Sequence, residues 1–436
     1  MPARSPVCST AGSCARTACP WFPSLSHAAP RAGTALPKGL PVTAADPLLD
    51  LHRALRAAAP HDLVRALTRV LDEHLGVGRC TLLLADYGVS ALQPFGTEPS
   101  PDTAVPVGGT PAGRAYLSQE PVVIGAPEAP EQTAYLPVSV RGDRIGVLEV
   151  VLPAGADPTL TSVLSEAAQA LGHELVAADP STDVYAKARR LRRLTLAAEM
   201  QWDLLPGRSC ERPEFTLGAQ LEPAYSVRGD NFDWSVSERK LSISVTNGMG
   251  HGVHAASLTA LAVSALRNAR RSGADLAFQA ELASQAVWSA HTGSGYVKSV
   301  LMEIDLATGS VDAIDAGSPK VTRLRDGQVE RIELDAQFAL GALEDTRYVP
   351  ERFMLHPGDR LVVVGEGVHG FRSEAGEVFG DRLLAACVRK NRLAPAPEAA
   401  RAVLRDLALF RGDTTATDDA VCLCLDWRGA TARPEI

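Results

Sequence analysis

Residues 241–252, LSISVTNGMGHG, join a strand-like pattern to a glycine-rich turn. Leu241, Ile243 and Val245 alternate with hydroxyl-bearing residues, which predicts a strand with one buried face. Three glycines then fall within residues 248–252, where they let the backbone turn sharply and approach another group closely. The Ala- and Leu-rich run 253–271 predicts a helix. A strand, a glycine turn and a helix in this order can hold an ion or a phosphate, although an ordinary turn fits the same residues.

Acidic residues lie in three further loops, each beside a predicted strand. Asp230 lies in RGDNFD at 228–233, and Glu366 lies in GEG at 365–367, directly after the predicted strand 360–364. Asp418 and Asp419 precede the predicted strand 421–425. Because binding residues gather on loops that a rigid sheet positions, we expect these carboxylates to converge on one site.

Taken in order, these segments resemble the motifs of the PPM-type metal-dependent protein serine/threonine phosphatases, in their bacterial sporulation-phosphatase (SpoIIE-like) branch. That branch has the motifs G-G-D-F-Y-D, D-x-M-G-H-G, A-G-H-P-P, T-D-G and a final D-D. The matching segments lie at 228–233, 247–252, 316–319, 365–367 and 418–419, and QWDLLP at 201–206 resembles the family's Q-x-x-L-L-P. The resemblance covers roughly residues 195–428, and the order of five motifs is far more specific than any one motif.

The resemblance implies a reaction and a set of ligands. Two Mn²⁺ or Mg²⁺ ions, about 3.5–4 Å apart, activate water for attack on a phosphorylated serine or threonine, so no protein nucleophile is needed. The implied substrate is a phosphorylated regulatory protein, such as an anti-sigma-factor antagonist. Hard ions of this kind prefer carboxylate and carbonyl oxygens. The implied catalytic residues are Asp230, Asn247 and Asp419, and the implied metal ligands are Asp230, Asn247, the Gly248 carbonyl, Glu366, Asp418 and Asp419.

Four positions depart from the family pattern. Asn247 stands where the family has the aspartate that bridges both metals, and a neutral amide holds divalent cations less well. Glu366 replaces the aspartate of T-D-G, while Arg228 and Ser318 replace a glycine and a histidine. Two functions therefore stay open: an active phosphatase with weakened metal affinity, and a pseudophosphatase that binds its partner without turnover.

Length and composition argue against several classes of protein. The 436 residues carry a net charge of −8, which does not predict a nucleic-acid-binding protein. No apolar run approaches the roughly 18–20 residues that a membrane helix needs, so we expect no membrane segment. The eight cysteines are scattered along the chain, which favours structural thiols over disulfides and fits a protein of the reducing cytoplasm. Cys422 and Cys424, two apart in a predicted strand, should face the same side of it, toward a core.

The first part of the chain divides into two segments. Residues 1–44 are rich in Pro, Ala, Ser and Gly without periodicity, which predicts disorder. Residues 45–178 resemble a GAF domain, an α/β sensor fold, in the order of their predicted elements. Such a domain either binds a small molecule or serves only as a scaffold. The predicted elements are a helix over 47–75, strands at 80–85, 91–94 and 122–124, a short helix at 113–119, a hairpin over 132–152 and a helix over 159–177.

Residues 179–209 are predicted to be a helical linker. Apolar residues recur there near a spacing of 3.5, which predicts one helix over 180–205 that pairs two protomers. We therefore expect a homodimer through this helix. The recurring residues are Val184, Ala188, Leu191, Leu194, Ala198 and Leu205.

Residues 210–428 are predicted to form the second domain, followed by a tail at 429–436. Runs of predicted strands are flanked by pairs of predicted helices, at 254–271 with 276–291 and at 380–389 with 396–410. This pattern predicts two antiparallel sheets with helices outside them. The phosphatase family implies the same four-layer αββα sandwich, so the predicted fold class is α/β, of the α+β kind, for the whole chain.

Overall fold

The structure, a computed structural model, describes residues 47–126, 131–153, 158–222, 227–317, 319–373, 375–412 and 418–430. The disorder predicted for residues 1–44 falls outside this part of the chain, as does most of the tail predicted at 429–436. Within the described residues, no helix combines the length and the apolar character needed to cross a membrane.

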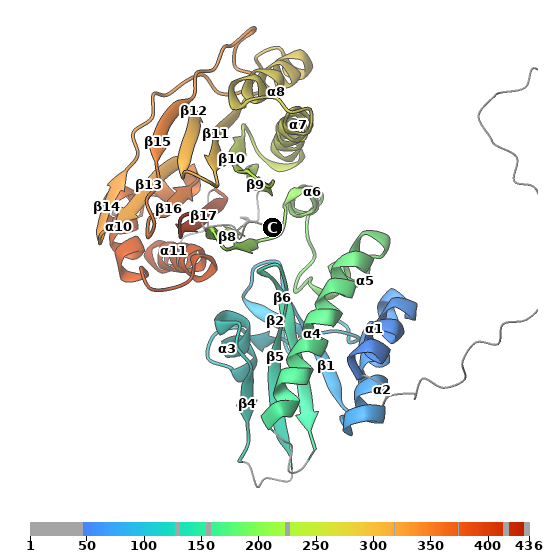
Figure 1. Ribbon diagram of the computed structural model, residues 1–436. Coiled ribbons are helices and arrows are strands. Elements are labelled where there is room, and N and C mark those ends of the chain that lie inside the picture. Colours follow the sequence, from blue (N-terminus) through green and yellow to red (C-terminus); the bar gives the residue numbers. More distant parts are fainter. Residues whose placement is uncertain are drawn as a thin grey trace, which may run out of the picture. The chain divides into compact units, whose positions relative to one another are not determined.

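The first domain is built on one antiparallel sheet with the strand order β3-β2-β1-β6-β5-β4 (Figure 1). Helices α1 (Pro47–Ala57), α2 (Leu63–Leu75) and α4 (Pro158–Ala178) bury an apolar core against one face, and α3 (Pro111–Ser118) packs on the other. The strands are β1 (Cys80–Ala85), β2 (Ala91–Pro94), β3 (Val105–Pro106), β4 (Val122–Ile124), β5 (Gln132–Val140) and β6 (Asp143–Leu152).

The single helix predicted over 47–75 is wrong, because the chain forms two helices there. A short 3-10 turn, η1 (Pro60–Asp62), separates α1 from α2. Pro60 has no N–H to donate, and its ring clashes with a preceding helical turn, so a continuous helix cannot pass through it. The separated helices pack together against α4 in one core.

The single linker helix predicted over 180–205 is also wrong. The segment contains η2 (Asp179–Ser181), α5 (Val184–Ala188) and α6 (Leu196–Leu204), with no helix across the arginine-rich residues 189–195. Tyr185 of α5 is buried in the core of the first domain and donates to the Pro60 carbonyl at 2.6 Å. Trp202 of α6 is buried in the core of the second domain, and Thr195 caps the start of α6. Each helix therefore packs on its own domain. The homodimer stays a prediction, but the continuous helix on which it was based is not formed.

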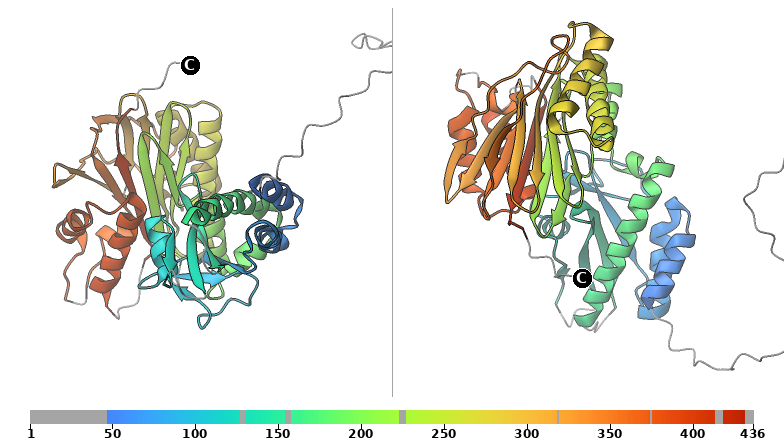
Figure 2. Two further views of the ribbon diagram at one scale, coloured as in Figure 1. Left: turned by 60° about the horizontal axis from the view of Figure 1, so that its bottom comes forward. Right: turned by 45° about the horizontal axis from the view of Figure 1, so that its top comes forward.

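The second domain stacks two antiparallel sheets between two pairs of helices, as Figures 1 and 2 show. The first sheet has the order β15-β12-β11-β10-β9, and the second has the order β14-β13-β16-β17-β8-β7. The predicted αββα sandwich is therefore confirmed. The strands are β7 (Ser209–Arg212), β8 (Phe215–Glu222), β9 (Asp230–Val236), β10 (Lys240–Gly248), β11 (Val297–Asp305), β12 (Ser310–Ala316), β13 (Lys320–Arg325), β14 (Gln328–Arg331), β15 (Glu351–Met354), β16 (Arg360–Val364) and β17 (Ala420–Trp427).

Alternation along the strands divides the apolar side chains of this domain among three cores. Leu241, Ile243 and Val245 face the core between the sheets, as their spacing predicted. Helices α7 (Gly252–Arg271) and α8 (Leu276–His291) cover the outer face of the first sheet. Helices α10 (Gly380–Lys390) and α11 (Ala396–Arg411) cover the second sheet, where Cys422 and Cys424 face them. The prediction that both thiols face one side, toward a core, is confirmed.

Strand β10 is longer than the sequence predicted. Its alternation was expected to end at Val245, but it continues through Asn247 and Gly248, which pair with Lys298 and Val297 of β11. Tertiary pairing extends the strand into residues whose composition is typical of a turn, because the neighbouring strands supply hydrogen-bond partners. The extension fixes Asn247 within the sheet.

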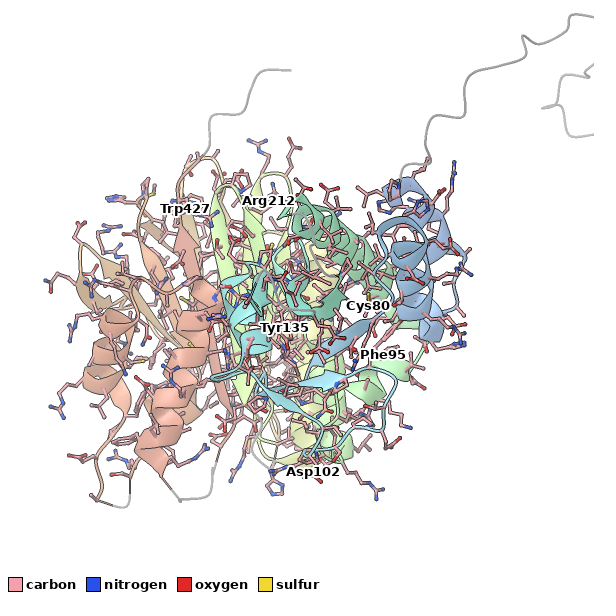
Figure 3. The ribbon with its side chains drawn as sticks, turned by 90° about the horizontal axis from the view of Figure 1, so that it is seen from below. Cys80, Phe95, Asp102, Tyr135, Arg212 and Trp427 are labelled. Atoms are coloured by element: carbon pink, nitrogen blue, oxygen red, sulfur yellow. The ribbon has the colours of Figure 1, made fainter. Side chains whose placement is uncertain are left out.

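Strand β17 runs away from this end of the molecule. It begins at Ala420, next to Asp419, and ends at Trp427. Trp427 and Arg212, which Figure 3 labels, both pair with Phe215 of β8. They mark the end of the second sheet opposite to Asp419. Asp419 is thus at the end of the sheet where the acidic loops meet.

Candidate metal centre

Three adjacent strands place one residue each side by side at the edge of the first sheet. Asn247 in β10 pairs with Asp230 in β9 on one side and with Lys298 in β11 on the other. Directly opposed residues of antiparallel strands project from the same face of a sheet. An acidic, a neutral and a basic side chain therefore form a row, which we call the site row: Asp230, Asn247 and Lys298.

Asp230 is a buried carboxylate with one oxygen that accepts no hydrogen bond from the part of the chain that the structure describes. The residue is 0% exposed, its Oδ1 accepts from the Asn247 amide, and its Oδ2 has no partner among the described residues. Burial raises the pKa of Asp230 well above its usual range, and the charges of Asp419 and Asp418 raise it further. Because a buried carboxylate costs free energy unless it is neutralised, this position favours a proton or a cation.

Asp419 is fully buried as well, and helix α6 holds it in place. Its Oδ2 accepts from Gln201 Nε2 at 2.8 Å and from the Arg228 backbone N–H at 2.9 Å. Gln201 Nε2 also donates to the Asp230 carbonyl at 2.5 Å, so one amide ties two acidic segments together. Asp418 accepts from the Asp419 backbone N–H at 2.9 Å, and burial raises the pKa of Asp418 to about 6.

Glu366 differs from the aspartates because it already has a positively charged partner. It begins the short helix α9 (Glu366–His369), and its Oε2 accepts from Lys298 Nζ at 2.6 Å. This hydrogen bond lowers the pKa of Glu366, and the charges of His369 and Lys320 lower it further. The Glu366 side of the site is therefore compensated by cations of the chain itself.

Glycines on both sides of Glu366 allow the loops to meet. A Cβ atom at Gly365 would lie 2.6 Å from Asp230 Oδ2, and one at Gly367 would lie 1.8 Å from the Asp419 carbonyl oxygen. Both distances are too short for a side chain, so only glycine brings α9 this close to both aspartates.

The structure brings together all the residues that the sequence predicted for the site. Gly248 ends β10 against helix α7, where a Cβ atom would lie 2.5 Å from Thr259 Oγ1. The roles of the six residues as ligands or catalytic groups stay predictions, and Ser318, one of the departures from the family pattern, lies outside the described residues. The six are Asp230, Asn247, Gly248, Glu366, Asp418 and Asp419.

Asp233, three residues after Asp230, has a structural role instead. It is 2% exposed and forms ion pairs with Arg267 and Arg270 of α7 at 2.8 and 3.2 Å. These pairs join the first sheet to its covering helix. Asp233 therefore lies outside the candidate site.

The fit of a hard divalent cation differs between the two sides of the site. Among the described residues, no three His, Cys, Asp or Glu side chains lie in the arrangement of a ready-made metal site. The chain's own donors occupy Asp419 Oδ2 and Glu366 Oε2, so a cation would have to displace them. Asp230 Oδ2 has no such donor, and the nearby carboxylates are ligands that Mg²⁺ and Mn²⁺ prefer. The residues fit a cation on the aspartate side but not on the Glu366 side.

The contacts of two residues that shape the site, Gln201 and Lys298, could not be predicted from the sequence. Gln201 was noted within QWDLLP, but nothing in that motif shows that its amide reaches Asp419 across 218 positions. Lys298 lies in an apolar strand pattern, where a lone lysine usually points to solvent. Counting the cross-strand register from residues 240–248 to 297–305 would have placed it opposite Asn247.

Family models match two segments of the chain, one in each domain. The model of the family "Stage II sporulation protein E (SpoIIE)" matches residues 237–428, and the model "GAF domain" matches residues 59–178. The chain contains a GAF domain followed by a SpoIIE-family domain. No curated protein matches the chain.

Several solved structures are similar to the SpoIIE domain. The SiaA-PP2C domain of Pseudomonas aeruginosa is 25% identical, with 49% of this chain and 85% of that chain covered and a TM-score of 0.43. The PP2C phosphatase domain of SpoIIE from Bacillus subtilis, with a fragment of its regulatory domain, is 18% identical, with 50% and 65% covered and a TM-score of 0.42. The catalytic domain of the phosphatase PstP, in complex with 2 manganese ions, is 18% identical, with 49% and 98% covered and a TM-score of 0.35. The family models, rather than these matches, assign the domains.

Proposed function

We propose that the SpoIIE domain is a metal-dependent phosphatase that removes phosphate from serine or threonine of a regulatory phosphoprotein, such as an anti-sigma-factor antagonist. The observation that carries this proposal is the buried Asp230. Its Oδ2 has no hydrogen-bond partner within the described residues, while the negative charges of Asp418, Asp419 and Glu366 act on it. Such a position is stable at neutral pH only when a cation or a proton neutralises it.

The proposed roles follow from the contacts. Asp230, Asp418 and Asp419 would hold Mn²⁺ or Mg²⁺, and a bound ion would activate water and neutralise phosphoryl oxygens. Gln201 and the Arg228 backbone N–H orient Asp419, so they are positioning groups. The Asn247 amide occupies Asp230 Oδ1, which leaves Oδ2 as the available ligand atom.

Phosphate release from phosphoserine and phosphothreonine peptides tests this function. We expect release that requires Mn²⁺, that EDTA stops, and that Asp419→Asn abolishes. Asp312→Asn is the matched control, because Asp312 is an aspartate on strand β12 that pairs with Arg352 away from the site. Absence of turnover at millimolar Mn²⁺, in protein whose folding is verified, would remove the proposal.

A second function, a binding module without turnover, is favoured by one specific observation. Asn247 is neutral and donates to Asp230, while Lys298 neutralises Glu366, so the site is partly compensated without any metal. The variant Asn247→Asp discriminates between the two functions. If only this variant releases phosphate, while the natural chain binds the same phosphopeptides unchanged, the natural chain is the binding module.

We also propose that the GAF domain and the segment after it serve regulation, through a small-molecule ligand and a homodimer. The GAF-family match supports the ligand, and sequence spacing alone supports the dimer. Sedimentation at micromolar concentration tests the dimer, and a strict monomer would exclude it.

A further inference from the structure

Lys298 occupies a position in the site that its strand fixes. It is the second residue of β11 and stands in register with Asn247, so its side chain leaves the same face of the sheet. Its ammonium lies 2.6 Å from Glu366 Oε2, and its side chain is 31% exposed. The ammonium is therefore tethered at the glutamate rather than free in solvent.

The two sides of the site differ in how their charge is balanced. Asp230 is fully buried and has one oxygen without a partner among the residues that the structure describes, whereas the Glu366 side chain is 45% exposed and pairs directly with Lys298. The site row carries one negative and one positive charge with a neutral amide between them. A second metal ion would need an anionic ligand in the middle of this row and an uncompensated Glu366, and the described residues provide neither.

We propose that Lys298 supplies a built-in positive charge in place of a second metal ion, so that the site binds one divalent cation, on the aspartate side. The proposal rests on the proposed function and deepens it. A tethered ammonium competes with a dissolved ion for Glu366 at a high effective concentration. It also offers the phosphoryl group a hydrogen-bonding cation beside the bound ion, so Lys298 would be a substrate-positioning residue.

Metal stoichiometry, measured by isothermal titration of the full chain with Mn²⁺, tests the proposal without reference to turnover. We expect one ion per natural chain and two ions per chain in the double variant Asn247→Asp with Lys298→Met. The single variant Lys298→Met should gain a second site that the natural chain lacks, about tenfold weaker than the second site of the double variant, which corresponds to about 1.4 kcal/mol.

The matched control is Lys320→Met. Lys320 also acts electrostatically on Glu366 but pairs with Val364 in the second sheet, outside the site row. This variant should bind one ion, like the natural chain. Melting curves verify that each variant is folded, and replacing a partly exposed ion pair such as Lys298–Glu366 leaves the fold intact.

The possible outcomes separate this inference from the proposed function. Two ions on the natural chain, or only one on the folded double variant, would overturn the role of Lys298 and leave the phosphatase in place. No ion on the natural chain at millimolar Mn²⁺ would overturn both, and would favour the binding module.

Discussion

Gln201 Nε2 lies 2.8 Å from Asp419 Oδ2. This hydrogen bond joins helix α6, which precedes the sheets of the SpoIIE domain, to an acidic residue just before the last strand of that domain. Both side chains are buried, with 2% and 0% exposed. The same amide reaches the Asp230 carbonyl. The geometry of the site therefore depends on α6, although α6 contributes no proposed ligand.

The first prediction concerns this amide. Gln201→Ala should raise the Mn²⁺ concentration needed for half-maximal activity by about tenfold, because Asp419 loses a donor that orients it. The control is Gln279→Ala, since the buried Gln279 donates to Glu303 at 2.9 Å away from the site. Both variants should lose about 1–3 kcal/mol of unfolding free energy in urea, but only Gln201→Ala should change the metal requirement. Equal metal requirements for the two variants would contradict the positioning role.

A second prediction concerns two aspartates of strand β9. Asp230→Asn should raise the unfolding free energy of the metal-free protein, because it removes a buried carboxyl group whose ionised form burial and the neighbouring aspartates destabilise. Asp233→Asn should lower it by about 3–5 kcal/mol, because Arg267 and Arg270 lose their buried partner. Thermal melting with EDTA and with Mn²⁺ measures both effects. Mn²⁺ should stabilise Asp233→Asn but not Asp230→Asn, and the opposite pattern would place the cation elsewhere.

The third prediction is a pH dependence. Burial raises the pKa of Asp418 from 3.8 to about 6, so the folded chain holds this proton more tightly than the unfolded chain. The stability that Asp418 contributes is therefore present below about pH 4 and is lost as the pH rises through about 6. In EDTA, the unfolding free energy of the natural chain relative to Asp418→Asn should fall over this interval. With Mn²⁺ the difference should rise instead, because the cation replaces the proton.

The fourth prediction concerns the glycines around Glu366. Gly367→Ala should destabilise the domain by about 1–3 kcal/mol and weaken Mn²⁺ binding, because its Cβ would lie 1.8 Å from the Asp419 carbonyl. Gly108→Ala is the control, since a Cβ there meets nothing within 4 Å. Unfolding in urea and Mn²⁺ titration measure the two effects. A Gly367→Ala protein as stable as the control would show that α9 does not pack against Asp419 as described.

Much of the SpoIIE fold could be predicted from sequence because its strands alternate cleanly. The alternation of Leu241, Ile243 and Val245 predicts a strand face buried between the sheets. The spacing of Cys422 and Cys424 predicts that both thiols lie on one face of their strand, which packs against the helices. The linker helix was predicted wrongly because helical spacing is a local signal. Tyr185 and Trp202 are buried in the cores of two different domains. The spacing of apolar residues does not show that the two ends of the segment pack in different cores.

The acidic residues of the site could be predicted as well, because ordered motifs carry them. The role of Lys298 could not be predicted, because it depends on the register between β10 and β11 and on the rotamer that reaches Glu366. The same holds for Gln201, whose contacts span the whole domain. A local pattern can therefore contain such a residue without showing which distant residues it contacts.

If acidic residues from separate loops hold a divalent cation, anomalous diffraction from crystals grown with Mn²⁺ will locate the ion. We expect an anomalous peak in contact with Asp230 and Asp419, with Lys298 still at Glu366. Crystals soaked in millimolar Mn²⁺ that show no peak at these aspartates, or a peak only at other surfaces of the molecule, would contradict it.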